Sequence, residues 1–141
     1  MMTFERFMKK NKIVKENTTY AATKSLVDEN GEPLKWVIRP VTTKQNELMR
    51  NECTKEIPMG KPGAFRPKLD FSKYMAKFLV ASVEMPNLYD KDLQNSYDVM
   101  TPEDLVQAMV DDPGEYQDFV SFVQEYQGFT EMDKEVEEAK N

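Results

Sequence analysis

Apolar residues recur with helical spacing between Pro67 and Pro86, in the segment PKLDFSKYMAKFLVASVEMP. At about 100° per residue the apolar side chains fall on one broad arc. They are Phe71, Tyr74, Met75, Phe78, Leu79 and Val83. The carboxylate of Asp70 is suited to cap the first turn, and Pro86 disfavours helical geometry at the residue before it. This pattern predicts a central core helix at residues 70–85 that packs against several neighbours.

Residues 18–41 show a second pattern, because segments 18–23 and 36–38 are rich in β-forming residues. Between them lies Asn30-Gly31, a dipeptide that tolerates the positive φ angles of a tight hairpin turn. We predict an antiparallel β-hairpin over residues 18–41. A two-stranded ribbon is marginally stable alone, so this hairpin must pack on helices or gain a strand.

The register of this hairpin has two solutions. If the Asn-Gly dipeptide forms a two-residue loop, Val27 faces Leu34. Pro33 leaves open a register that is shifted by one residue, in which Leu26 faces Leu34 instead. The sequence does not decide between these two registers.

Capping signals mark the other helices. Thr42 opens a T-x-x-Q capping box, which predicts a helix over residues 42–53. The motifs TPEDL, beginning at Thr101, and DPGE, beginning at Asp112, each combine a capping side chain with proline in the first turn. Gly128 lies where a left-handed C-cap would close the last helix. A short helical turn before Thr101 and a helix at the N-terminus complete a set of five to six helices.

Residues 54–67, TKEIPMGKPGAFRP, contain three prolines and two glycines, which interrupt both a helical and a strand pattern of apolar residues and predict a loop. Three basic side chains against Glu56 make it basic within an acidic protein. The ordinary interpretation is a solvated loop. The alternative is an arm for an acidic or strand-like partner, because long loops in compact domains are often functional. Lys61, Phe65 and Arg66 are its candidate partner-binding residues.

Residues 3–10 predict a short amphipathic helix, with Thr3 as its cap and Phe4, Phe7 and Met8 on one face. Three large apolar side chains on two turns require a surface to pack against. The ordinary expectation is that they dock on the protein's own core. The alternative is that they bind a partner, which makes them the second set of candidate partner-binding residues.

Together these patterns predict an α+β fold that is predominantly helical, with the helices packed around the central helix and one small antiparallel hairpin. The length of 141 residues fits one domain, which we place at residues 1–129. Residues 130–141 carry five acids, two lysines and few apolar side chains. We expect this acidic tail to be a frayed helix or disordered.

Composition excludes several kinds of chemistry. The chain has no histidine and one cysteine, Cys53, which excludes histidine-based acid–base catalysis, a Cys/His zinc site and an internal disulfide. Neither a P-loop nor a G-x-G-x-x-G motif occurs. We therefore expect no enzyme, and no catalytic, cofactor-binding or metal-binding residues. The net charge of −6 argues against nucleic acid as a partner, and no run of about eighteen apolar residues is present to span a membrane.

An ordered set of segments resembles a known family. The segments are DENGEPLKWVIRPVT, LMRNECTKE, the block from LDFSKYMAKFLVASVEMPNL through SYDVM, and PGEYQDFVSFVQEYQGF. Together they are similar to the XkdN-like phage tail assembly chaperones, which occur in contractile-tailed phages and defective prophages of Gram-positive bacteria. The resemblance runs from the N-terminal helix to Phe129. Its specificity lies in the ordered set, because none of the segments is chemically diagnostic alone.

The resemblance implies a non-enzymatic assembly factor that works in the cytoplasm of the bacterial host and is absent from the mature virion. Its implied partners are the tape measure protein, which it keeps soluble, and the tail tube protein. Ten methionines and eight phenylalanines would supply adaptable apolar surface for such binding. A structural subunit retained in the finished tail is the alternative function, and self-association is left open.

Overall fold

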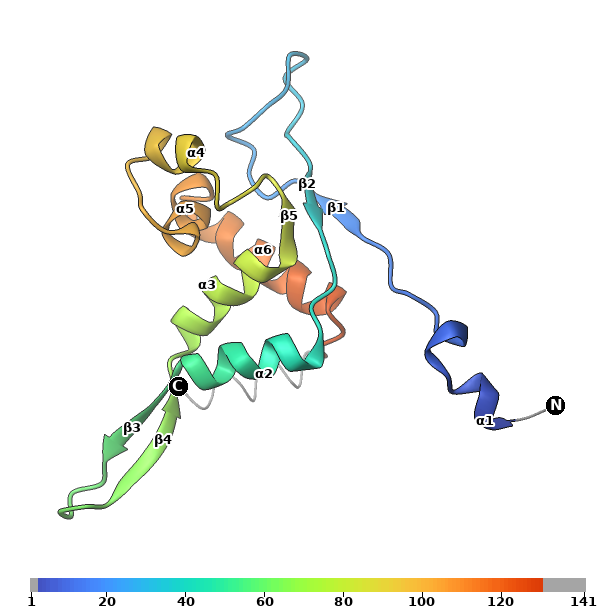
Figure 1. Ribbon diagram of the computed structural model, residues 1–141. Coiled ribbons are helices and arrows are strands. Elements are labelled where there is room, and N and C mark those ends of the chain that lie inside the picture. Colours follow the sequence, from blue (N-terminus) through green and yellow to red (C-terminus); the bar gives the residue numbers. More distant parts are fainter. Residues whose placement is uncertain (1–2, 131–141) are drawn as a thin grey trace.

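A computed structural model describes residues 3–130 and shows a helical body from which three segments project (Figure 1). Within this range the helices are α1 (Thr3–Arg6), α2 (Thr43–Glu52), α3 (Phe71–Ser82), α4 (Lys91–Ser96), α5 (Pro102–Met109) and α6 (Pro113–Tyr126), with a 3-10 turn, η1 (Lys9–Asn11). The strands are β1 (Thr18–Tyr20), β2 (Trp36–Ile38), β3 (Thr54–Pro58), β4 (Phe65–Leu69) and β5 (Val83–Met85). The predicted α+β, predominantly helical class is confirmed. The predicted acidic tail lies, after Thr130, outside the described residues.

Helix α3 is the centre of the body, as predicted. The carboxylate of Asp70 accepts a hydrogen bond from the backbone N–H of Lys73 at 3.1 Å and caps the first turn. The buried residues of α3 are Tyr74, Met75, Ala76, Phe78, Leu79, Val80 and Ser82. The helix contacts α2, α5 and α6. The broad apolar arc therefore packs on several helices at once.

The predicted helix over residues 70–85 is wrong in its last three residues. Helix α3 ends at Ser82, and the chain continues as β5, which pairs antiparallel with β2. Val83 of β5 is buried and lies opposite Ile38. A helical arc and a buried strand both place Val83 inside, so the local pattern does not separate them. The pairing with a distant strand decides the conformation.

The strands β1, β2 and β5 form a three-stranded antiparallel sheet in the order β1-β2-β5. At the base of the predicted hairpin neither predicted register is correct, because Tyr20 lies opposite Trp36. Near the tip the shifted register is found, since the N–H of Leu34 donates to the carbonyl of Leu26 at 2.8 Å. The two pairs are six positions apart on the first strand, from Tyr20 to Leu26, and two positions apart on the second, from Leu34 to Trp36. The first strand therefore leaves the ladder between them.

Aromatic rings join this sheet to α6. Trp36 is buried and meets the edge of Phe119, with 5.4 Å between the ring centroids. Tyr20 stacks on Phe119 and on Phe122 at 5.7 and 4.2 Å. The hairpin thus obtains both a third strand and a helix to pack on, the two supports that a marginal two-stranded ribbon requires.

The prediction that residues 54–67 form a loop is wrong. They belong to a two-stranded antiparallel ribbon of β3 and β4, which projects from the body (Figure 1). Its tip is a turn in which the N–H of Ala64 donates to the carbonyl of Lys61 at 3.0 Å, with Pro62 and Gly63 between them. Gly63 adopts a φ of +78°, as the third position of a type II turn requires.

The prolines of this ribbon explain the error. The N–H of Asp70 donates to the carbonyl of Cys53 at 2.8 Å, and that of Met59 to the carbonyl of Ala64 at 3.0 Å. Antiparallel pairs alternate between bonded and non-bonded, so the proline within each strand falls at a non-bonded position. There the N–H would point out of the ribbon, and its loss leaves the ladder intact.

The predicted helix ends are confirmed in the C-terminal half and at α2. Side chains of Thr42, Thr101 and Asp112 each accept a hydrogen bond from a backbone N–H in the first turn of the helix that follows. Gly128 adopts a φ of +98° after α6. The N–H groups of Gly128 and Phe129 donate to carbonyls in the last turn, which is a Schellman motif.

Candidate functional site

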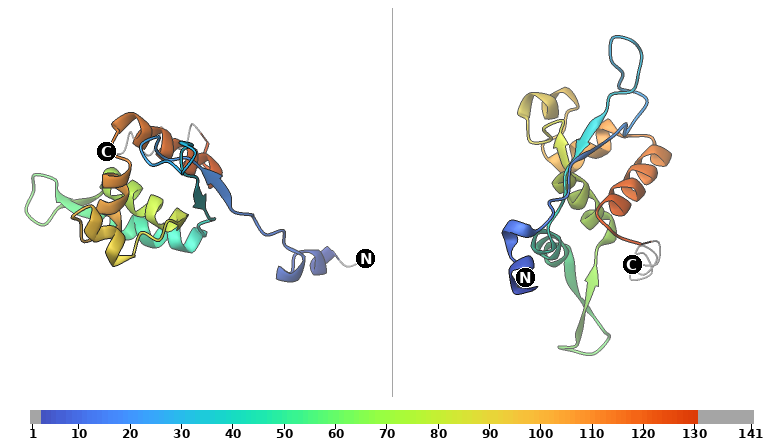
Figure 2. Two further views of the ribbon diagram at one scale, coloured as in Figure 1. Left: turned by 90° about the horizontal axis from the view of Figure 1, so that it is seen from above. Right: turned by 90° about the vertical axis from the view of Figure 1, so that its right-hand side faces the viewer.

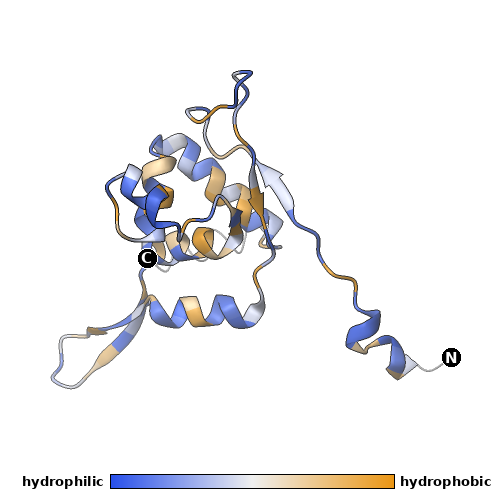
Figure 3. Ribbon diagram, turned by 45° about the horizontal axis from the view of Figure 1, so that its top comes forward, coloured by the Kyte–Doolittle hydropathy of each residue, from blue (hydrophilic) through white to orange (hydrophobic). Residues whose placement is uncertain are grey.

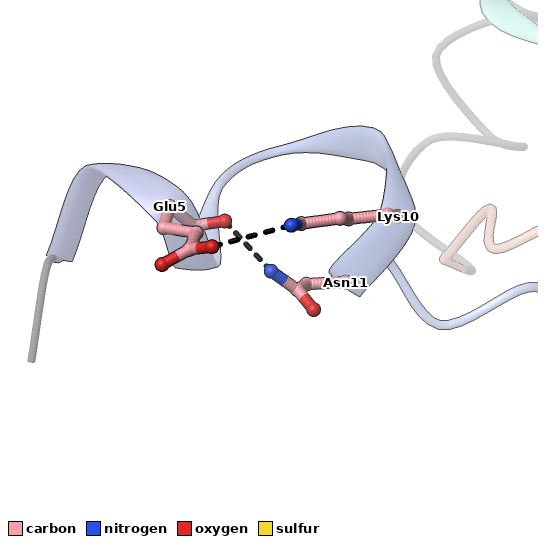
Figure 4. Close-up of polar contacts among 3 residues, drawn as sticks. All are labelled: Glu5, Lys10 and Asn11. Atoms are coloured by element: carbon pink, nitrogen blue, oxygen red, sulfur yellow. Dashed lines mark hydrogen bonds and ion pairs between the residues drawn. The ribbon is translucent and has the colours of Figure 1, made fainter.

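The N-terminal arm, residues 3–17, extends away from the body (Figures 1 and 2). The predicted continuous helix over residues 3–10 is wrong, because Met8 is extended, with a ψ of 151°, and separates α1 from η1. Glu5 joins these two turns (Figure 4). Its carboxylate accepts a hydrogen bond from Nζ of Lys10 at 3.2 Å, and its carbonyl accepts one from Nδ2 of Asn11 at 2.7 Å. These two contacts connect α1 with η1 within the arm.

The apolar residues of the arm do not dock on the protein's own core, so that expectation is wrong. Phe4 and Phe7 are 72% and 82% exposed, and Met8 is 45% exposed. Sequence reasoning missed Ile13 and Val14, which are 92% and 82% exposed. The signal that could have identified them is an isolated pair of β-branched residues within a basic segment. The arm thus presents five large apolar side chains to solvent.

The C-terminal end of the arm is anchored on the body. The Nζ of Lys15 lies 4.3 Å from the centroid of the Tyr126 ring and donates to the Tyr126 carbonyl. The Tyr126 hydroxyl donates to the carbonyl of Glu16 at 2.6 Å, and burial raises the pKa of this hydroxyl, so it stays protonated. Asn17 donates to the carboxylate of Glu84 at 3.1 Å. The arm therefore leaves the body beside α6 and β5.

The ribbon, residues 54–69, forms the second candidate surface. Cross-strand pairing places Lys55 opposite Lys68 and Ile57 opposite Arg66, and side-chain alternation puts all four on one side. We call these four residues the basic face. Like charges directly opposite each other destabilise an antiparallel pair. An acidic ligand would relieve this repulsion.

The three sequence-predicted residues of the ribbon do not share one surface. Phe65 lies opposite Pro58 and, being adjacent to Arg66, points to the other side of the ribbon. Lys61 lies in the turn at the tip. Sequence reasoning missed Lys55 and Lys68 as members of the basic face. The spacing of K-x-I and R-x-K, with side chains at every second position, is the signal that could have found them.

A cleft of about 380 Å³ lies where the basic face meets the body. Its lining consists of Lys55 and Ile57 from β3, Lys68 and Leu69 from β4, and Asp70, Phe71 and Ser72 at the start of α3. Two lysines and one aspartate thus lie beside apolar side chains. This combination fits a segment that carries both acidic and apolar side chains.

The arm and the ribbon are separate surfaces. Figure 1 and the view from above in Figure 2 both show them projecting from opposite sides of the body. Hydrophobic and hydrophilic positions alternate in both segments (Figure 3). The six predicted partner-binding residues are therefore divided: Phe4, Phe7 and Met8 belong to the arm, and the other three to the ribbon.

Residues 3–130 contain no group of three or more histidine, cysteine or acidic side chains that could hold a metal ion. No helix in this range is long and apolar enough to cross a membrane. Cys53 is buried, and burial raises the pKa of its thiol, which keeps the sulfur protonated and shielded.

Comparison with known proteins identifies the family. The family model for the phage XkdN-like tail assembly chaperone protein, TAC, matches residues 4–140. Phage-like element PBSX protein XkdN of Bacillus subtilis (strain 168) is 26% identical over 136 residues, which cover 96% of this chain and 91% of that protein. The uncharacterized protein YqbN of the same strain is 24% identical over 133 residues, 94% of this chain and 89% of that protein.

A crystal structure of the protein YqbN matches the fold, with a TM-score of 0.75 and 20% identity over 92% of this chain and 99% of that chain. At this identity the structural likeness supports the fold alone. The family model, in contrast, spans nearly the whole sequence. The chain therefore belongs to the family of phage XkdN-like tail assembly chaperones.

Proposed function

We propose that this tail assembly chaperone binds the tape measure protein of its phage, and also the tail tube protein, in the cytoplasm of the host. It keeps the tape measure protein soluble until tube subunits assemble around it, and it is absent from the mature virion. The observation that carries this proposal is the N-terminal arm, whose five large apolar side chains are presented to solvent.

Burial of these side chains would drive binding. Transfer of a single large apolar side chain from water is worth about 1.5–3 kcal/mol. Five such side chains could contribute on the order of 10 kcal/mol before the costs of ordering and association are subtracted. Helix α1 has only four residues, too few to be stable as an isolated helix. A partner surface would therefore stabilise the arm while the arm covers an apolar segment of the partner.

The chemistry of the arm suits such a segment. Phe4 lies in α1 and Phe7 directly follows it, so two aromatic side chains stand within one short segment that an apolar groove of a partner could accept. Five Lys and Arg side chains against one glutamate within the first fifteen residues would steer the arm toward acidic surfaces. On the opposite side of the body, the ribbon offers a second contact, with Arg66 on one side, Phe65 on the other and Lys61 at the tip, and the tail tube protein is its proposed partner.

Co-expression tests the proposal. The protein is produced with the tape measure protein of the same phage and, separately, with the tail tube protein. We expect each partner to co-purify, and the tape measure protein to move into the soluble fraction. Failure of both partners to co-purify or gain solubility would contradict the proposal. Peptide mapping of purified particles tests the second part: finding the chain there as a regular component would identify a structural subunit instead.

A further inference from the structure

We infer that the basic face of the ribbon is the docking site of this chain's own C-terminal segment, residues 131–141. This inference goes beyond the proposed function and does not depend on it, because no phage partner takes part. The sequence of the segment is EMDKEVEEAKN. Its occupation of the basic face would shield the cations from one another.

The basic face lacks anionic partners in the described part of the chain. Within residues 3–130, Lys55, Arg66 and Lys68 form no ion pair, and Lys55 stands directly opposite Lys68. Two lysines in this arrangement repel each other. The ribbon projects from the body (Figure 1), and Asp70 at its base lines the same cleft as Lys55 and Lys68. The basic face can therefore take up negative charge from another segment.

The C-terminal segment has the matching chemistry. Its acids Glu131, Asp133, Glu135 and Glu137 occupy every second position. In an extended chain such residues point to one side, as do the cations of the basic face. Charge and spacing therefore agree between the segment and the face.

The segment can also reach the basic face. The described chain ends just after Phe129, whose ring packs against Phe78 of α3 with 5.8 Å between centroids. Phe71, at the start of α3, lines the cleft and lies seven residues before Phe78, or about 10 Å along the helix axis. Eleven extended residues span up to about 36–40 Å. The tether is therefore long enough to cross from Phe78 to the ribbon.

Side-chain charge, rather than strand addition, would hold the segment. Pro58 removes an outward N–H from the edge of β3, and Pro67 removes one from the edge of β4. An added strand would meet a missing donor on either edge. Because the segment is tethered, its effective concentration at the basic face is of millimolar order, so an intrinsic Kd of about 1 mM or tighter suffices for occupation.

A spin label on the full chain tests this inference. Cys53 is buried, so a nitroxide reagent would label the new thiol of an Ala139→Cys variant. At about 0.05 M salt we expect paramagnetic broadening of the amide NMR signals of residues 54–69. At about 0.5 M salt the Debye length falls to about 4 Å, and the broadening should disappear. It should not change on tenfold dilution, because the contact is within one chain.

Charge reversal supplies the controls. The Lys55→Glu/Lys68→Glu and the Glu135→Lys/Glu137→Lys variants should each lose the broadening, and the combination of all four substitutions should restore it. Lys35→Glu/Lys44→Glu, at exposed lysines outside the ribbon, makes the same charge change as the first variant and should keep the broadening. No broadening of the ribbon, equal broadening in the Lys55→Glu/Lys68→Glu variant, or transfer of the broadening to a second, unlabelled copy would each overturn the inference.

Discussion

The ring of Phe129 stands edge-on against the ring of Phe78, with 5.8 Å between their centroids. Phe78 is buried at the centre of α3, and Phe129 follows the left-handed cap that ends α6. One aromatic pair thus connects the central helix with the end of the last helix. It also determines where the C-terminal segment leaves the body.

The Phe78→Ala substitution should destabilise the protein. It removes this ring contact and leaves a cavity in the core, so the free energy of unfolding should fall by about 3–5 kcal/mol. Urea denaturation measures the change. Phe65→Ala, at an exposed position on the ribbon, is the matched control and should stay within about 0.5 kcal/mol of the parent protein. An unchanged midpoint for Phe78→Ala would show that this residue is not in the core.

The side chain of Gln127, after α6, bonds the segment that follows β2 and the end of α3, so its removal should lower the free energy of unfolding. Its Oε1 accepts a hydrogen bond from the N–H of Val41 at 3.0 Å, while its Nε2 donates to the carbonyl of Arg39 at 2.8 Å and to Oγ of Ser82 at 3.1 Å. Gln127→Ala should lower the free energy of unfolding by about 1–3 kcal/mol, since half-buried partners lose their bonds. Gln117→Ala, on the exposed side of α6, is the control. Equal stability of the two variants would contradict the bridging role.

Glu115 should make stability depend on pH. Its carboxylate accepts a hydrogen bond from the hydroxyl of Thr23 at 2.7 Å and one from the N–H of Lys24 at 2.9 Å, and these bonds, that of Thr23 foremost, lower the pKa of Glu115. A carboxyl whose pKa is lower in the folded state stabilises fully above its unfolded pKa. That contribution disappears as pH falls through the folded pKa.

The Glu115→Gln variant tests this dependence. It should be less stable than the parent protein at about pH 7, and the difference should shrink below about pH 4 as the parent carboxylate is protonated. Urea denaturation at a series of pH values gives the difference at each pH. Glu47→Gln, at an exposed position on α2, is the control. A difference between Glu115→Gln and parent that is constant down to about pH 3 would refute the assignment.

Cys53 should report unfolding. It is fully buried at the end of α2, and burial raises the pKa of its thiol. We expect its reaction with an aromatic disulfide reagent to be blocked in the native protein and to appear along the urea transition. The thiol of a Glu47→Cys variant, at an exposed position on α2, provides the comparison within one chain. Immediate reaction of one thiol per native parent chain would contradict the burial of Cys53.

Local signals predicted the parts of the fold whose causes are local. Asp70, Thr42, Thr101 and Asp112 cap helices through side chains that reach only the next turn, so their effect is visible in short motifs. The strand at Val83–Met85 was hidden, because it depends on pairing with β2, more than forty residues earlier. Non-local pairing leaves no short motif.

The candidate surfaces were predictable only in part. The apolar residues of the arm are evident in the sequence, but their exposure is not, because a periodic pattern does not reveal which surface covers it. The ribbon was predicted as a loop because it contains prolines, which usually interrupt strands. The prolines fall at non-bonded positions because Met59 forms a bonded pair with Ala64 at the tip and the pairs alternate from there. The sequence does not specify this pairing.

The most direct test of the central claim is the amount of tape measure protein that stays soluble when it is co-expressed with variants of the full chain. Phe4→Ser/Phe7→Ser removes exposed apolar side chains from the arm, whereas Leu48→Ser/Met100→Ser removes exposed apolar side chains from the body and is the matched control. Because all four positions are exposed, we expect the unfolding midpoint of both variants to match the parent. The arm variant should leave the tape measure protein as insoluble as it is without the chaperone, and the control should solubilise it like the parent. Undiminished solubilisation by the arm variant would contradict the account.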